Sequence, residues 1–357
     1  MDRSRRGPDK TPRPREPRRS NELALDLPLV FALIVALSIA LYVVLDGFDL
    51  GIGILFLLAP SDPERDTMMN SVAPVWDGNE TWLVMGGTLL FAAFPIVYAA
   101  VLPAFYVPLM LMLFALVFRG VAFEFRFRAM RSRFLWDWAF SAGSGLAALM
   151  QGMMLGAFID GVPVRDSQFA GTIFSFFSAF TLVSGLGVVA GYALLGATWL
   201  IFKTEARTQD FARRLAPWSL AATLLFIGIV SIWTPFTHPF IRDRWFALPN
   251  FLFLWPVPFV TAALAFGIWR AVSGKRDYLP FLLSIGLFMI AFIGLGISLW
   301  PYAIPYSITI EQAAGSRDTL LFLAVGTAII LPITLTYLGY TYRIFRGKVS
   351  SGYEHHP

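Results

Sequence analysis

Four carboxylic acids interrupt stretches of the chain that are otherwise apolar. Asp46 and Asp49 lie within YVVLDGFDLGIGILFLL, and Asp77 and Glu80 open WDGNETWLVMGGTLLFAAFP. An ionised carboxylate at the bilayer centre costs roughly 2.5–3.5 kcal/mol, so such residues usually line a route for ions, protons or substrates. Each pair is three residues apart and would share one helix face, where two carboxylates do not both ionise at low cost. The pairs indicate groups that take up and release protons; the alternative is acids at helix ends in the headgroup region.

The composition is that of a membrane protein whose spans lack haem ligands. Of the 357 residues, 57% are hydrophobic and 14% are charged, and 34 Phe and 11 Trp suit lipid-facing surfaces and interfacial belts. The absence of Cys excludes disulfides, thiolate ligation of haem and cysteine-ligated iron–sulfur clusters. The three histidines, His238, His355 and His356, lie outside the apolar stretches. We therefore expect no intramembrane haem ligand and no metal site in this chain.

Long apolar runs with short loops predict an all-α integral membrane protein, because lipid requires each spanning segment to satisfy its own backbone hydrogen bonds. Spans need roughly 20 residues, and nine are expected, over 27–58, 75–99, 103–123, 138–159, 171–202, 217–235, 251–270, 280–303 and 319–342. They would form one transmembrane domain (23–345) between a basic N-terminal arm (1–22) and a cytoplasmic tail (346–357). Gly47 and Gly51 are four residues apart, a spacing that allows close helix contact.

Lys and Arg are concentrated in alternate loops. Loops 59–74, 124–137, 203–216 and 271–279 and the C-terminal tail carry most of them. The positive-inside rule places these loops and the C-terminus in the cytoplasm, with the N-terminus outside. The four acids then lie toward the cytoplasmic half, from which a proton-consuming enzyme would draw protons.

The basic N-terminal arm argues for the opposite orientation. Its sequence, MDRSRRGPDKTPRPREPRRS, is Pro-rich and lacks the apolar region of a signal peptide. We expect this arm to be disordered.

Several distinctive motifs occur along the chain, each at one place. They are DGFDLG and WDGNE, FRGVAFEFR after the third span, GYALLGATWLIFKTE in the fifth and PYAIPYSITI near the eighth. From about Asp26 to Lys348 the chain resembles subunit II of the cytochrome bd-type quinol oxidases, and its late segments are most similar to the cyanide-insensitive branch.

The resemblance implies a fold of two four-helix bundles plus one extra helix, which agrees with nine spans. In that family subunit I holds the haems and oxidises quinol. Subunit II holds no haem, packs against subunit I, and is thought to help deliver cytoplasmic protons for the reduction of oxygen to water. The chain would thus be a multi-pass subunit of a heterodimeric terminal oxidase of the respiratory chain, in the bacterial inner membrane. Alone it would bind no cofactor; a structural quinone and a small accessory subunit are further components that the family allows, and no nucleic acid is expected.

The resemblance also assigns roles to residues, none of them catalytic. Proton transfer falls on Asp77, with Asp49 in support, and Asp46 lies on the same face as Asp49. Glu80 lies where the family tolerates an amide. Trp76 is the candidate for stacking on a quinone or packing at the subunit boundary.

Two other interpretations of the acids compete with a proton route. A purely structural assembly subunit would use them as packing polar groups. A proton-coupled secondary transporter would also place acids in broken, glycine-rich helices. Among the arginines, Arg119 is predicted to form a structural salt bridge with Glu124. Cytoplasmic arginines such as Arg126 and Arg133 are interpreted as topology determinants, with contacts to a partner or to anionic lipid as the alternative.

Overall fold

A computed structural model describes residues 26–349 and is almost entirely helical. The helices are α1 (Leu27–Phe56), α2 (Asp62–Asn70), α3 (Trp76–Ala93), α4 (Pro95–Ala104), α5 (Tyr106–Arg128), α6 (Arg133–Asp160), α7 (Ala179–Lys203), α8 (Ala206–Thr237), α9 (Pro239–Phe246), α10 (Asn250–Leu254), α11 (Pro256–Ser273), α12 (Leu279–Leu299), α13 (Ile310–Ala313) and α14 (Arg317–Ile344). Two antiparallel hairpins complete the fold: β1 (Val164–Arg165) with β2 (Gln168–Phe169), and β3 (Tyr302–Ile304) with β4 (Ile308–Thr309).

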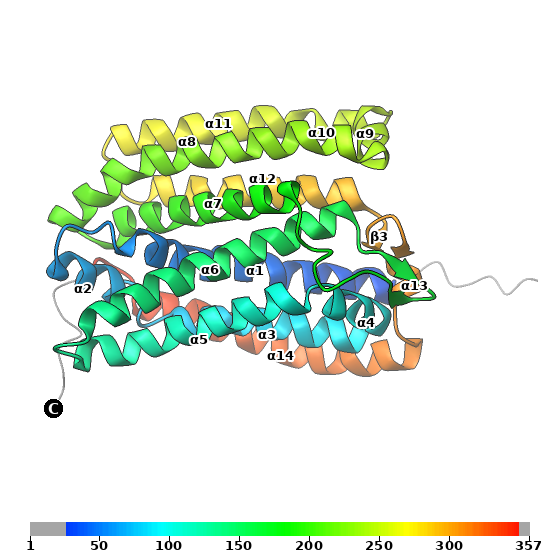
Figure 1. The fold of residues 1–357 in the computed structure, drawn as a ribbon, viewed down its shortest axis with the longest axis horizontal. Coiled ribbons are helices and arrows are strands. Elements are labelled where there is room, and N and C mark those ends of the chain that lie inside the picture. The colour runs from blue at the N-terminus through cyan, green and yellow to red at the C-terminus, as the bar shows by residue number, and fades with distance from the viewer. Residues whose placement is uncertain (1–25, 350–357) are drawn as a thin grey trace, which may run out of the picture.

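The long helices lie side by side in two groups of four, as Figure 1 shows. Helices α1, α3, α5 and α6 pack together, and α7, α8, α11 and α12 form the second group. Contacts of α7 with α1 and α6 join the two groups, and α14 lies outside them against α3 and α1. The predicted arrangement of two four-helix bundles plus one extra helix is therefore confirmed.

Eight helices of the described part are long and apolar enough to cross a membrane. The second expected span, 75–99, is instead divided between α3 and α4. Phe94 leaves helical geometry (φ −131°, ψ 62°), as expected of a residue that precedes a proline. The break frees the Ala93 carbonyl from the helix. This carbonyl instead accepts a hydrogen bond from the backbone N–H of Gly315 at 2.8 Å.

Other boundaries differ from the hydropathy pattern for local reasons. The helix expected from 171 begins only at Ala179, because Ser178 caps it with its side chain and the segment before it joins the β1–β2 hairpin. The helix expected from 217 begins at Ala206, since charged residues at the membrane surface continue a helix that hydropathy alone does not detect. The loop 59–74 contains α2, an amphipathic helix that was not predicted.

The two ends of the bundle are different in character. The β1–β2 hairpin, β3 and α13 gather where α1 begins, whereas α2 and the end of α14 lie at the opposite end (Figure 1). Residues 1–22 lie outside the described part, as does most of the tail expected over 346–357. The part of the tail that is described is packed: the Val349 N–H donates to the Lys203 carbonyl at 2.7 Å.

Candidate functional site: carboxyl groups around a buried arginine

A buried guanidinium lies at the centre of three of the four predicted acids. Arg119 of α5 has no exposed surface. Its Nη1 lies 2.9 Å from Asp46 Oδ1 and 2.6 Å from Glu80 Oε1, and its Nη2 lies 3.6 Å from Asp49 Oδ2. The cluster thereby joins α1, α3 and α5.

The expected salt bridge between Arg119 and Glu124 is not formed. Five residues along a helix turn a side chain to a different face, whereas ion pairs form at spacings of three or four. Glu124 is exposed and makes no ion pair within residues 26–349. The prediction was wrong because it considered α5 alone; the partners of Arg119 come from other helices.

One face of α1 lies almost directly on α7. A Cβ atom on Gly51 would lie 1.8 Å from the backbone oxygen of Tyr192, and one on Gly196 would lie 2.4 Å from the backbone of Gly51. Glycine at these positions therefore allows the two backbones to touch. Gly51 is five residues from Asp46 and two from Asp49, so these acids point to a different side of α1. Their carboxyl groups are inaccessible and lie on the side that faces Arg119.

The α3 motif contributes an amide as well as a carboxyl group. Asn79 donates to Asp49 Oδ2 at 2.8 Å and to the Leu45 carbonyl at 3.2 Å, and its own oxygen accepts from the Tyr342 hydroxyl at 2.8 Å. Glu80 keeps 28% of its side chain exposed. Asn79 thus connects Asp49 to α14, and Glu80 connects the cluster to the surface.

A second hydrogen-bonded chain lies beside Asp46 in the interior. Gln151 of α6 donates to the Tyr42 hydroxyl at 2.7 Å, and the Tyr192 hydroxyl donates to Gln151 at 2.7 Å. Sequence reasoning missed Asn79, Gln151 and Tyr342, although Asn79 stands inside the WDGNE motif. The signal that would have found it is an amide inside a span, in the same short motif as two acids.

Asp77 does not join the cluster. It is exposed on α3 and forms no ion pair within the described residues. Helical spacing places it in an exposed stripe with Thr81, Val84, Thr88 and Phe91. Asp77 is therefore not gathered with Asp46 and Asp49: it points away from the chain, one turn before Glu80, which contacts Arg119.

Trp76 packs within the chain. Its ring stacks on Phe123 with centroids 4.9 Å apart and an interplanar angle of 5°, and the Arg119 guanidinium lies 5.9 Å from its centroid. One face of the indole is thus covered by α5, beside the ion cluster.

The cluster can hold protons because its charges do not balance. Three carboxyl groups share one guanidinium, so full ionisation would leave a net charge of −2 in a region that excludes water. Such uncompensated charge is costly in the interior, and protonation of a carboxyl group removes it. Both Asp46 oxygens and Asp49 Oδ1 also lack a hydrogen bond in good geometry. The arrangement suits carboxyl groups that exchange protons, and within residues 26–349 it offers no grouping of metal ligands.

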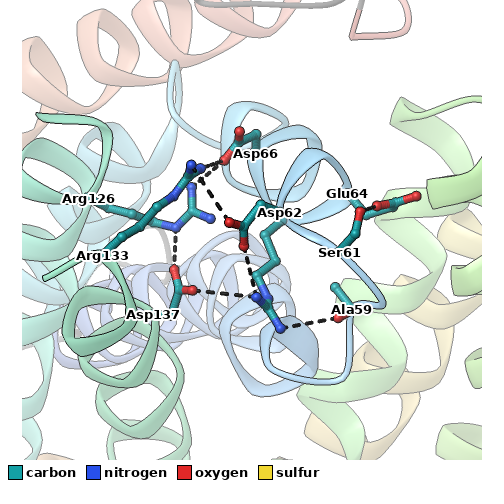
Figure 2. A network of polar contacts seen from close by, with 9 residues as sticks. Ala59, Ser61, Asp62, Glu64, Asp66, Arg126, Arg133 and Asp137 are labelled. Atoms are coloured by element: carbon teal, nitrogen blue, oxygen red, sulfur yellow. Dashed lines mark hydrogen bonds and ion pairs between the residues drawn. The ribbon is translucent and has the colours of Figure 1, made fainter. Parts of the chain in front are cut away.

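A second ion network lies at the α2 end of the bundle, shown in Figure 2. The buried Arg126 pairs with Asp137 and with Asp66, in each case at 2.5 Å. Arg133 also pairs with Asp66, and Arg65 lies 3.7 Å from Asp137. Arg126 and Arg133 therefore fasten α2 to α5 and α6, a structural role beyond that of topology determinants.

Comparisons with known proteins agree with this architecture. Residues 27–345 match the family model described as cytochrome bd terminal oxidase subunit II. The cytochrome bd-I ubiquinol oxidase subunit 2 of Escherichia coli (strain K12) is 29% identical, over 91% of this chain and 95% of the relative. The cytochrome bd ubiquinol oxidase subunit 2 of Bacillus subtilis is 26% identical, over 90% of this chain and 96% of the relative.

A solved structure shares the fold. A chain of the bd oxidase from Geobacillus thermodenitrificans superposes with a TM-score of 0.68 at 12% identity, covering 90% of this chain and 99% of that chain. The comparisons distinguish no branch within the family. Taken with the family match along nearly the whole described chain, they show that this protein belongs to the cytochrome bd terminal oxidase subunit II family.

Proposed function

We propose that this subunit of a quinol oxidase partners the haem-bearing subunit I and helps deliver cytoplasmic protons for the reduction of oxygen to water. The observation that carries the proposal is the sharing of one buried guanidinium by three carboxyl groups. Electrons need not pass through this chain, whereas its acids can hold and release protons.

Asp77 would be the point of contact between this chain and its partner. A carboxylate on the outer stripe of α3 is costly against lipid, and that cost falls if subunit I covers the stripe and supplies a polar or cationic partner. Asp77 then lies at the subunit boundary, one turn from Glu80, whose side chain is still 28% exposed. The proposed route runs from the cytoplasmic end through Asp77 and Glu80, with Asp49 and Asp46 as the buried proton store.

The surroundings of Trp76 favour packing at the subunit boundary over stacking on a quinone. Phe123 already occupies one stacking face of the indole, so a quinone ring could stack only on the other. We therefore assign Trp76 to the subunit boundary, beside the Arg119 cluster. A structural quinone elsewhere in the complex is compatible with this assignment.

The test is substitution of Asp77 in the complex co-expressed with subunit I. Asp77→Asn should leave the complex assembled with normal haem spectra and should slow oxygen consumption, because a placed proton-transfer group commonly contributes about 10²–10⁴-fold. Asp77→Glu should be milder, since it keeps the ionisable group. Asp318→Asn, at an exposed position in the first turn of α14, is the matched control.

The competing function is that of a purely structural subunit. It is favoured by the way Arg119 fastens α1, α3 and α5 together. If Asp77→Asn assembles fully and turns over at the parental rate at every pH, the relay is refuted. Loss of the complex, with Asp318→Asn intact, would instead assign Asp77 a structural contact. A secondary transporter has no support from the family to which the chain belongs.

A further inference from the structure

An apolar groove of about 660 Å³ lies between α1, α7, α12 and α14. Its walls include Phe48 of α1, Trp199 of α7, Phe281 of α12, and Gly339 and Tyr342 of α14. The groove is distinct from the carboxyl cluster and is linked to it through Asn79, which bonds to the Tyr342 hydroxyl and the Leu45 carbonyl.

A buried cation lies beside two of the aromatic rings that line this groove. Lys203, the last residue of α7, is only 7% exposed. Its ammonium lies 5.5 Å from the ring centroid of Trp199 and 5.9 Å from that of Phe202, both of which line the groove. It donates one hydrogen bond, to the Phe345 carbonyl at 2.5 Å, and is therefore held between α7 and the end of α14.

The charge of Lys203 is not balanced by the chain around it. Across residues 26–349 it forms no salt bridge, and Asp277, which Lys348 links to the Thr204 carbonyl, is already paired with Lys348 and Arg213 at 2.6 Å each. An ammonium has three donors, and a buried charge is costly unless it is paired. The geometry therefore calls for an anion at this end of the groove.

On α14 the groove is lined at Leu335, Leu338, Gly339 and Tyr342, a spacing of three to four residues that marks one helix face. The helix ends at Ile344, and Lys203 contacts the segment beyond it through the Phe345 carbonyl. The groove thus combines an apolar channel with a buried cation at the end predicted to be cytoplasmic.

We propose that this groove binds an anionic phospholipid, with an acyl chain against Phe48, Trp199 and Phe281 and the phosphate at Lys203. Basic sites between membrane helices on the cytoplasmic side recognise acidic lipid headgroups in this way. A quinone would fill the apolar part of the groove and leave Lys203 without an anion.

The test uses the complete complex with subunit I, stripped of lipid in detergent and studied by native mass spectrometry. Dioleoyl phosphatidylglycerol and dioleoyl phosphatidylcholine are added at equal concentration. The parental complex should retain phosphatidylglycerol preferentially. Lys203→Gln should weaken its binding roughly fivefold, the effect of one basic side chain at an anionic surface, and should leave phosphatidylcholine unchanged. Arg128→Gln, which removes an exposed arginine at the same end of the bundle, is the control and should change neither.

A second variant keeps the test decisive if Lys203→Gln does not assemble. A Cβ on Gly339 would meet no atom within 4 Å, so Gly339→Phe fills the groove and leaves Lys203 in place. It should reduce the binding of both lipids. Equal binding of the two lipids to the parental complex, or unchanged binding in both variants, would overturn the proposal. So would the extraction of a quinone from the parental complex that is lost in Gly339→Phe.

Discussion

Arg119 is the residue on which the proposed site depends most. It faces carboxyl groups from two other helices, and all of its own surface is buried. Removing one partner of a buried ion pair typically costs about 3–5 kcal/mol, because the remaining charge is left unpaired. At the residue scale, the arginine is therefore the structural centre of the cluster and supplies the one positive charge that its three carboxyl groups share.

We predict that Arg119→Gln lowers the yield and the thermal midpoint of the assembled complex. Asp46→Asn should partly restore both, since it removes one of the carboxylates that the substitution leaves unpaired. Thermal melting of the four members of this double-mutant cycle provides the measurement, with Arg128→Gln as the exposed control. If the complex carrying Arg119→Gln has the same thermal midpoint as the parental complex, a buried ion cluster is ruled out.

Asp277, which lies outside the membrane spans, makes a contact whose stability should depend on pH. Its pKa is lowered chiefly because Lys348 donates a hydrogen bond to it, against the opposing effect of burial, and Arg213 adds to the lowering. A carboxyl group whose pKa is lower in the folded state stabilises that state above its unfolded pKa of about 3.9, and the contribution is lost as pH falls through the folded pKa. The affected contact is the attachment of 346–349 to the α11–α12 loop.

Hydrogen–deuterium exchange measures this attachment. After correction for intrinsic rates, protection at Val349 should be constant from pH 7 to 5 and should fall below about pH 4. The loss should be small, up to about fivefold, because partly exposed ion pairs contribute roughly 0.2–1 kcal/mol. Asp277→Asn should remove the pH dependence of this protection. If the variant keeps the pH dependence of the parental protein, another group is responsible.

At the element scale, the close crossing of α1 and α7 helps to join the two groups of helices. In Gly51→Ala the new methyl group on α1 would clash with the backbone of α7, since the ideal Cβ would lie 1.8 Å from the backbone oxygen of Tyr192. The helices must separate, and overpacking of this kind typically costs 1–3 kcal/mol or more. We predict a lower thermal midpoint of the complex, read from loss of haem absorbance on heating.

The matched control for this crossing is Gly87→Ala on α3. A Cβ there meets nothing within 4 Å, so this variant should melt like the parental complex. Equal midpoints for Gly51→Ala and Gly87→Ala would show that the close contact of α1 with α7 does not determine stability.

At the scale of the whole molecule, hydropathy predicted the membrane spans well and the partners of their polar groups poorly. The approximate number of spans follows from runs of apolar residues, each of which can be recognised alone, whereas the two bundles were expected from the family resemblance. The partners of Arg119 and the outward direction of Asp77 depend on the rotation of one helix against another. That rotation is set by contacts between helices, such as that of Gly51 with Tyr192. It therefore cannot be predicted from the hydropathy pattern of a single span.

The distribution of charge between the ends of the bundle gives the last prediction. Arg65 in α2, Arg128 at the end of α5 and Arg207 at the start of α8 belong to one end, whereas Arg165 in β1 and Arg242 in α9 belong to the other. The first end carries the greater share of Lys and Arg, and such loops remain in the cytoplasm. Reporter fusions should therefore place Arg65, Arg128 and Arg207 inside and Arg165 and Arg242 outside. The reverse pattern at all five sites would mean that the basic arm over 1–22 governs insertion. It would also move the Arg119 cluster to the outer half of the membrane, where it could not take protons from the cytoplasm.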